Sequence, residues 1–334
     1  MSTHISVIGS GVAGLVVASE LVDRGAKVTV FEKTEEIAGH ACSRYAGGML
    51  APWCERESAE EAVVTLGVEA ASWWEQHTSL VERNGTLVVA QGRDRSELKR
   101  FASRTSNYKE VHSEGIDELE PDLAGRFQAG LFFQEEAHLD PRKALGVLAK
   151  RLKQGGVGFE TGVAVSPDDV SGIVIDARGF AARDQLQELR GVKGEMLLLR
   201  CKDVQLNRPI RMLHPRIPLY IVPRADQVFM VGATMIESAD RQRITARSML
   251  ELLGSAYALH PAFGEAEVLE TGVDVRPAFP DNLPRVETRG NVISINGLYR
   301  HGFLLSPAMA RMAADLVMAS TNASQKEVSH AHQA

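Results

Sequence analysis

Three glycines and one glutamate near the amino end have the spacing of a nucleotide-binding turn. Gly9, Gly11 and Gly14 form a G-x-G-x-x-G pattern, and Glu32 follows at the end of the next apolar stretch. In such a turn the first glycine allows a sharp bend, the second lets the backbone approach a pyrophosphate, and the third lets a helix pack closely on a strand. The glutamate can accept hydrogen bonds from a ribose, whereas it would repel a 2′-phosphate. The pattern therefore predicts a bound adenine dinucleotide other than NADP.

The segments around these residues have the pattern of a strand, a helix and a second strand. Residues 4–8 and 27–31 are apolar strands, and residues 12–21 between them form an apolar helix. The free N–H groups and positive dipole end of that helix favour phosphate. Two further apolar strands, 171–176 and 291–295, have the same character although they lie far along the chain. A sheet interrupted in this way is typical of large flavoprotein folds, so the pattern favours FAD over NAD.

Other apolar stretches lie between these strands and predict a second sheet. They are residues 87–90, 131–133, 195–199, 219–222 and 228–231. Turn residues separate them, which is typical of a largely antiparallel sheet. We interpret this sheet as the floor of a substrate domain.

The predicted fold class is therefore α/β combined with α+β. A discontinuous Rossmann-like FAD-binding domain is expected over residues 1–80, 138–190 and 272–320, and a substrate-binding domain with a mixed, largely antiparallel sheet over residues 81–137 and 191–271. A single helix is expected over residues 58–77, where apolar residues recur at helical spacing. The polar residues 321–334 are expected to form a flexible tail.

Composition excludes several classes of function. The chain has 334 residues and a formal net charge of −6, so no basic surface favours nucleic acid or an anionic membrane. No stretch approaches the length of a membrane span, and the first strand leaves no room for a signal peptide. Cys42, Cys54 and Cys201 lack metal-ligand spacing and are interpreted as small apolar residues in a reducing compartment. We expect a cytoplasmic protein without a metal site.

Four further segments carry a family resemblance. They are Ala46-Gly-Gly-Met-Leu-Ala-Pro52; Leu219-Tyr-Ile-Val-Pro-Arg224 with Val231-Gly-Ala-Thr-Met235; Val275-Arg-Pro277 with Leu283-Pro284; and Gly297-Leu-Tyr-Arg-His-Gly-Phe-Leu-Leu-Ser-Pro307. With the glycine-rich turn, they make the chain resemble the D-amino-acid-oxidase-like flavoproteins, and among these the glycine oxidases of thiamine (thiazole) biosynthesis. Asp176-Ala-Arg-Gly179 departs from the family's usual Ala-x-Gly ending.

The resemblance implies non-covalent FAD, because no cysteine lies near the carboxy-terminal flavin segment. Residues matching the ADP half are Gly9, Gly11, Val12, Ala13, Gly14, Glu32, Lys33 and, at the adenine, Val163. A loop along the pyrophosphate and isoalloxazine matches Cys42, Ser43, Gly47, Gly48 and Met49. The segment under the flavin pyrimidine ring matches Leu298, Tyr299, Arg300, His301, Gly302, Phe303 and Leu304.

The resemblance also implies a substrate site. Arg276 matches the guanidinium that pairs with an amino acid carboxylate, and Tyr220 matches a phenol that donates to it. Arg300 matches a second arginine, and Met49 and Met235 match the walls above the flavin. The expected reaction is oxidation of glycine, or of another small amine or D-amino acid, to an imine that hydrolyses to a 2-oxo acid and ammonia. Flavin N5 takes the hydride, no side-chain base is assigned, and O2 is reduced to H2O2.

Several alternatives remain at this point. Each arginine would be an ordinary surface ion pair if the resemblance were ignored, and Tyr220 would be part of the core. The protein could instead be a dehydrogenase that passes electrons to a quinone or carrier, or a flavin-binding partner with little turnover; an NAD-dependent dehydrogenase is the weakest competitor. The resemblance suggests two partners. One is a thiazole synthase that uses dehydroglycine, and the other is a second copy of this chain in a homo-oligomer, which is a tetramer in related glycine oxidases.

Overall fold

The computed structural model describes residues 4–214 and 219–331 and divides the chain into two compact units. Unit 1 contains residues 1–44, 142–190 and 276–334, and unit 2 contains residues 45–141 and 191–275. Both are mixtures of helices and sheet, which confirms the predicted fold class.

Unit 1 is built on a six-stranded sheet. Its order is β16-β17-β9-β1-β2-β8, and all neighbours are parallel except β16 and β17. The strands are β1 (His4–Ile8), β2 (Lys27–Glu32), β8 (Gly158–Thr161), β9 (Ile173–Asp176), β16 (Arg285–Arg289) and β17 (Val292–Asn296). Ile5 and Val7 of the central strand β1 are fully buried, as expected for a parallel strand covered on both faces.

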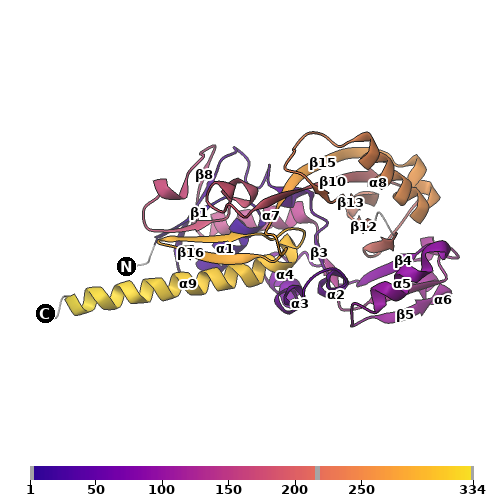
Figure 1. The fold of residues 1–334 in the computed structure, drawn as a ribbon, viewed down its shortest axis with the longest axis horizontal. Helices are drawn as coiled ribbons and strands as arrows, with labels where there is room; N and C mark the ends of the chain where they lie inside the picture. The colour runs from indigo at the N-terminus through magenta and orange to yellow at the C-terminus, as the bar shows by residue number, and fades with distance from the viewer. Residues whose placement is uncertain (1–3, 215–218, 332–334) are drawn as a thin grey trace. The chain divides into compact units, whose positions relative to one another are not determined.

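Three helices complete unit 1: α1 (Val12–Asp23), α7 (Pro141–Gln154) and α9 (Gly302–Ala331). Helix α9 runs alongside α1 (Figure 1), and small buried residues such as Ala313 and Ala314 allow close packing. Residues 302–321 of α9 are long and apolar enough to cross a membrane, but 61% of that window is buried inside the protein, as in the core helix of a globular fold.

Helix α9 also differs from the prediction for the carboxyl end. It continues to Ala331, whereas a flexible tail was expected from residue 321, and residues 332–334 lie outside the described part of the chain. No proline or glycine interrupts the residues that follow Thr321, so the sequence is compatible with a continued helix.

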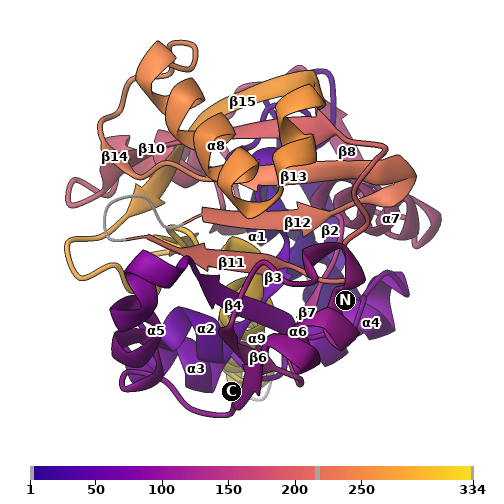
Figure 2. The ribbon, with the colours of Figure 1, turned by 90° about the vertical axis from the view of Figure 1, so that its right-hand side faces the viewer.

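Unit 2 contains a nine-stranded sheet, shown in Figure 2. Its order is β14-β10-β13-β12-β11-β4-β6-β5, with β15 also paired to β10; the described neighbours are antiparallel except β4 and β11. The strands are β4 (Thr86–Ala90), β5 (Lys109–His112), β6 (Ala129–Phe133), β10 (Arg190–Arg200), β11 (Ile210–Leu213), β12 (Leu219–Pro223), β13 (Val228–Gly232), β14 (Ile236–Glu237) and β15 (Glu267–Ala278).

Helices cover this sheet, and a small two-stranded sheet lies beside them. Strand β3 (Met49–Leu50) pairs with β7 (Ala137–His138). The helices of unit 2 are α2 (Pro52–Arg56), α3 (Glu61–Gly67), α4 (Ala70–Thr78), α5 (Arg95–Ala102), α6 (Ser113–Leu119) and α8 (Ala246–Leu259). Helix α8 packs on β12 and β13, where Leu252 and Ala256 join the buried core.

The segment 45–80 differs from the expectation in two ways. It lies in unit 2, although it was assigned to the FAD-binding domain, because Leu50 pairs with Ala137 and because Ala51 and Cys54 join a core cluster of unit 2. The expected helix 58–77 is divided into α3 and α4, since the chain turns after Gly67.

Candidate functional site

The glycine-rich turn of unit 1 requires glycine at two positions. Gly9 has φ = +103°, and a Cβ added there would lie 2.6 Å from the carbonyl oxygen of Ala177. A Cβ on Gly14 would collide with the carbonyl oxygen of Gly9. The turn between β1 and α1 therefore has the close backbone approach that a dinucleotide-binding turn needs. Ala177, which also lies near Gly14, was not recognised from the sequence as part of this contact.

The structure brings other predicted cofactor residues to the start of α1. The Val12 amide donates to Ser43 Oγ at 3.3 Å, and a Cβ on Gly11 would lie 3.4 Å from Ala41 Cβ. A Cβ on Gly302, at the start of α9, would lie 3.3 Å from Val12 Cγ1. In the described first turn of α1 there is no acidic side chain to neutralise the positive helix end. This arrangement fits a pyrophosphate.

Glu32 lies at the carboxyl end of β2, beside the turn. Its Oε2 accepts hydrogen bonds from the amide and hydroxyl of Ser10, at 3.0 and 2.6 Å. Its Oε1 accepts from the amide and hydroxyl of Thr34, at 3.1 and 3.0 Å. Burial alone would raise the pKa of the Glu32 carboxyl, but these hydrogen bonds outweigh burial and hold the pKa below its ordinary value. The carboxylate is therefore held as an anionic acceptor.

The Glu32 carboxylate can still accept a hydrogen bond from a ribose hydroxyl, because Thr34 has a second acceptor. The Thr34 hydroxyl carries one hydrogen and lies 3.0 Å from Glu32 Oε1 and 3.1 Å from the Glu36 carbonyl. Turning to Glu36 frees one lone pair of Glu32 for a ribose hydroxyl. Ser10 has the opposite role, since its hydroxyl also accepts from the Ala38 amide at 2.8 Å and so fixes the following loop.

Two other predicted contacts lie near Glu32. The Val163 amide donates to the Glu32 carbonyl at 3.0 Å, which places Val163 beside the end of β2. Lys33 is exposed on the same edge. Ser10 was missed as a site residue, although a hydroxyl inside a glycine-rich turn was visible in the sequence.

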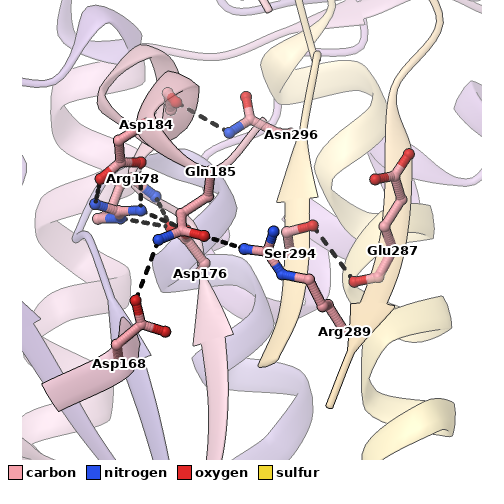
Figure 3. A network of polar contacts seen from close by, with 10 residues as sticks. Asp168, Asp176, Arg178, Asp184, Gln185, Glu287, Arg289, Ser294 and Asn296 are labelled. Carbon is pink, nitrogen blue, oxygen red and sulfur yellow. Dashed lines mark hydrogen bonds and ion pairs between the residues drawn. The ribbon is translucent and has the colours of Figure 1, made fainter. Parts of the chain in front are cut away.

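The segment Asp176–Gly179, which departs from the family pattern, takes part in an ion-pair network, drawn in Figure 3. Arg178 donates to both oxygens of buried Asp176 at 2.9 Å and to both oxygens of Asp184 at 2.9 Å. These carboxylates raise the pKa of the Arg178 guanidinium. The larger side chains thus point into a paired network, and the small Ala177 is kept where the chain contacts Gly9.

The Arg276 and Arg300 segments lie next to each other in unit 1. The Tyr299 amide donates to the Pro277 carbonyl at 3.0 Å, and both arginines are half-buried. Gly297 has φ = +75° and packs against the ring of Phe279, where a side chain would not fit. The predicted segment from Leu298 to Leu304 therefore leaves β17 by a tight turn and leads directly into α9.

In unit 2, Tyr220 and Met49 meet on one face of the sheet. Both pack, half-buried, against a cluster of Met196, Val222 and Met230. A Cβ on Gly47 would lie 2.8 Å from Tyr220 Cε2, so the glycine allows the loop to approach the phenol ring.

Other residues extend this face of unit 2. Arg224 Nη2 donates to the Gly47 carbonyl at 2.7 Å and fixes the loop. Tyr45 packs on the same cluster as Tyr220. Met235 is 47% exposed and is not part of the cluster. Tyr45, Met196 and Arg224 were not recognised from the sequence, since their proximity depends on strand pairing.

Two buried titratable residues, Glu136 and His138, lie next to the segment that contains Met49 and Cys54. The Cys54 amide donates to Glu136 Oε1 at 2.7 Å, and burial raises the pKa of Glu136 to about 7. His138 lies opposite Met49 in the β3–β7 pair. Burial, helped by the charge of Arg224, lowers the pKa of His138 to about 3, so its ring is neutral at physiological pH.

The candidate residues thus form two groups, each described within its own unit. In unit 1 the structure gathers the glycine-rich turn, Glu32, Ser43 and the start of α9, and it places the Arg276 and Arg300 segments side by side. In unit 2 it gathers Gly47, Met49 and Tyr220.

Comparison with known proteins gives consistent results. The model of the family "FAD dependent oxidoreductase" matches residues 4–316. A "putative thiamine biosynthesis oxidoreductase ThiO" of Rhizobium etli is 57% identical over 308 residues, covering 92% of this chain and 94% of the relative. A "bifunctional protein ThiO/ThiG" of Trichormus variabilis is 28% identical over 350 residues, covering 95% of this chain but 53% of that protein.

A third relative is named a glycine oxidase. The protein from Geobacillus kaustophilus is 26% identical over 352 residues, covering 94% of this chain and 92% of the relative. A crystal structure of glycine oxidase from the same species has a TM-score of 0.81 at 22% identity, covering 95% of each chain. That structural likeness supports the fold.

Proposed function

The chain belongs to the family of FAD-dependent oxidoreductases, and from that premise we propose that it oxidises glycine, or a similarly small amine or D-amino acid, with O2 as electron acceptor. The product imine would hydrolyse to a 2-oxo acid and ammonia or be used as dehydroglycine for the thiazole of thiamine. The observation that carries the proposal is the 57% identity to the thiamine biosynthesis oxidoreductase along nearly the whole chain.

The residues of unit 1 fit the ADP half of FAD. The start of α1 offers amides and a positive helix end to the pyrophosphate, and Glu32 offers an anionic acceptor to the ribose. When bound, FAD supplies the two-electron oxidation, accepting hydride at N5 and passing both electrons to O2, which gives H2O2. The start of α9 would place its positive end near the flavin pyrimidine ring and stabilise negative charge there.

We assign the substrate roles residue by residue. Arg276 would bind the substrate carboxylate through its planar guanidinium, which presents two parallel N–H donors. Tyr220 would donate its hydroxyl to the same carboxylate, and Arg300 would serve as a second cation. Met49 and Met235 would limit the space for the substrate side chain. The substrate amine must be neutral, because its nitrogen lone pair forms the C=N bond of the imine as hydride leaves the Cα, and we assign no side-chain base to this step.

We also propose partners and a location. Relatives that carry ThiO and ThiG in one chain support a thiazole synthase as the partner that receives the product. A homo-oligomer is proposed from the resemblance to glycine oxidases. Cys42, Cys54 and Cys201 all lie in the described part of the chain and form no disulfide there, which is compatible with the reducing cytoplasm that we propose.

An anaerobic substrate screen tests the proposed function. Purified protein should be yellow, and the flavin absorbance near 450 nm should bleach with glycine, sarcosine or a small D-amino acid. Peroxide formed in air, compared with reduction of an artificial dye, separates an oxidase from a dehydrogenase. A yellow protein that no amine or amino acid bleaches would contradict the proposal.

A further inference from the structure

Two opposite charges are buried inside the sheet of unit 2, in strand β10. The side chain of Glu195 is fully buried and that of Lys193 is 4% exposed, and Lys193 Nζ lies 3.4 Å from Glu195 Oε1. Taking two charges out of water is costly, and such pairs are weak contributors to stability compared with apolar residues of the same size. A buried pair of this kind therefore calls for another explanation, such as fixing one particular conformation.

The Glu195 carboxylate binds the segment that follows β13. The Thr234 hydroxyl donates to Glu195 Oε2 at 3.0 Å and accepts from the Glu195 amide at 2.9 Å, and the Thr234 amide donates to the Glu195 carbonyl at 3.1 Å. Glu195 Oε1 also lies 3.4 Å from the amide of Thr245, the residue that caps α8. One buried side chain thus ties the residue before Met235 to the start of a helix.

The strand register shows why this segment needs to be fixed. Met196 pairs with Gly232 of β13 and Lys193 pairs with Ile236 of β14, so the connection 233–235 between these strands has one residue more than the part of β10 that it spans. The ladder is interrupted here, and an irregularity of this kind can redirect a side chain, as a β-bulge does. The last residue of the connection is Met235, which is 47% exposed although it is a large apolar side chain.

Two further groups lie close to the Lys193 ammonium. Its Nζ lies 3.6 Å from Asp240 Oδ2 and 3.5 Å from the Arg243 carbonyl. These groups hold the chain on the far side of Met235, so the connection 233–235 is anchored both before and after this residue. Leu197 and Leu199 continue the same face of β10 into the core under α8, whereas Met196 faces the Tyr220 cluster.

We propose that Glu195, with Lys193 and Thr234, positions Met235 and so sets which substrates this enzyme accepts. The inference rests on the proposed function, in which Met235 limits the space for the substrate. Glu195 and Thr234 are positioning residues, since they act through Met235 and touch neither substrate nor cofactor in this account.

The first test is a double-mutant cycle on substrate preference. Thr234→Val removes both hydroxyl hydrogen bonds with little change of shape, Thr234→Ser keeps them, and Met235→Ala removes the positioned side chain. Thr78→Val is the matched control, because Thr78 is similarly buried in unit 2 and its hydroxyl donates to the Trp74 carbonyl. KM and kcat are measured for glycine, sarcosine, N-ethylglycine and D-alanine.

The proposal predicts a change in discrimination that depends on Met235. Thr234→Val should lower the kcat/KM ratio between the preferred and the next substrate by roughly five- to tenfold, mainly through KM, since small changes of pocket shape have effects of this size. Thr234→Ser and Thr78→Val should stay within about twofold of the wild type. In the Met235→Ala background, Thr234→Val should have no further effect. Unchanged ratios, or equal effects in both backgrounds, would overturn the proposal.

A second readout does not need turnover. With methyl-13C-methionine labelling, the Met235 resonance, assigned from Met235→Leu, should shift or broaden in Thr234→Val and stay unchanged in Thr78→Val. A wild type that no amino acid reduces would contradict the proposed function, whereas an unchanged Met235 resonance in Thr234→Val would contradict the positioning role.

Discussion

At the scale of single residues, the nucleotide end of the site depends on how Glu32 is held. The Ser10 amide and hydroxyl both donate hydrogen bonds to this carboxylate. The Thr34 hydroxyl can instead turn its hydrogen bond from Glu32 to the Glu36 carbonyl. Glu32 was predicted from the sequence because its position after the second strand is a local feature. The Ser10 contact joins residues 22 positions apart, so it became visible only when β1 and β2 were paired.

Ser10→Ala is therefore expected to weaken FAD binding. The change removes a donor to Glu32 and the acceptor of the Ala38 amide, so the carboxylate and the loop after it are held less firmly. We expect the Kd for FAD to rise roughly three- to tenfold, the range of one modest hydrogen bond. Titration of apoprotein with FAD, followed by flavin fluorescence, measures this Kd. Ser19→Ala is the control, since the buried Ser19 hydroxyl donates to the Leu15 carbonyl, and equal Kd values for all three proteins would contradict the role of Ser10.

Arg276→Lys tests the proposed carboxylate contact. A lysine keeps the charge but cannot form two parallel hydrogen bonds, so KM for glycine should rise by about 100-fold while the Kd for FAD stays within about twofold. Steady-state kinetics and the FAD titration measure the two quantities. The exposed Arg289→Lys is the control. An unchanged KM in Arg276→Lys would mean that this arginine does not bind substrate.

At the scale of elements, strands and helices with strong local patterns were predicted and long-range pairs were not. The elements β1, α1 and β2 were expected close to their observed bounds, because the apolar runs and the glycines mark their ends. The division of 58–77 into two helices was missed, since its apolar residues recur without interruption. Buried charges such as Glu195 look like ordinary strand residues in sequence, and only their pairing partners explain them.

Buried Glu136, the residue before β7, leads to a prediction about the pH dependence of stability. Burial raises the pKa of Glu136 to about 7, above its ordinary value of 4.5. Between these two pH values the unfolded chain releases this proton while the folded chain keeps it, so the wild type loses stability as pH rises through the window. Glu136→Gln keeps an acceptor for the Cys54 amide and carries no charge. The free energy of unfolding of Glu136→Gln, relative to that of the wild type, should rise by about 3 kcal/mol from pH 4.5 to 7, at ~1.4 kcal/mol for each pKa unit. Above this range the difference should level off.

Urea unfolding at a series of pH values measures this difference. The exposed neighbour Glu135→Gln serves as the control and should show no such trend. If the difference between Glu136→Gln and wild type does not change with pH, Glu136 does not carry a raised pKa in the folded protein.

At the scale of the whole molecule, the fold class and the division into discontinuous segments follow from the order of apolar strands along the chain. The carboxyl end could not be predicted in the same way, because a polar helix that continues from a buried one leaves little trace in the pattern. Among the residues of α9 whose burial is described, 302–321, Val317 is the last buried one, and Ser320 is exposed.

A chain ending at Ser320 is therefore expected to behave like the full protein. Thermal unfolding of the holoprotein should give a Tm within about 2 °C of the wild type, since no buried side chain described in α9 up to Val317 is removed. A chain ending at Ala310 removes the buried residues Ala313, Ala314 and Val317 of the helix that packs on α1, and it should lose FAD and much of its stability. Loss of FAD from the chain that ends at Ser320 would show that the remaining residues contribute to the fold.

The stoichiometry of glycine oxidation in air shows whether this protein is an amino acid oxidase. Purified yellow protein is mixed with glycine, and O2 consumption, H2O2, glyoxylate and ammonia are measured in the same sample. We expect the three products to form in equal amounts, one of each for every O2 consumed. A protein that binds FAD but neither consumes O2 with glycine, sarcosine or a small D-amino acid nor shows any change in its flavin spectrum would contradict this expectation.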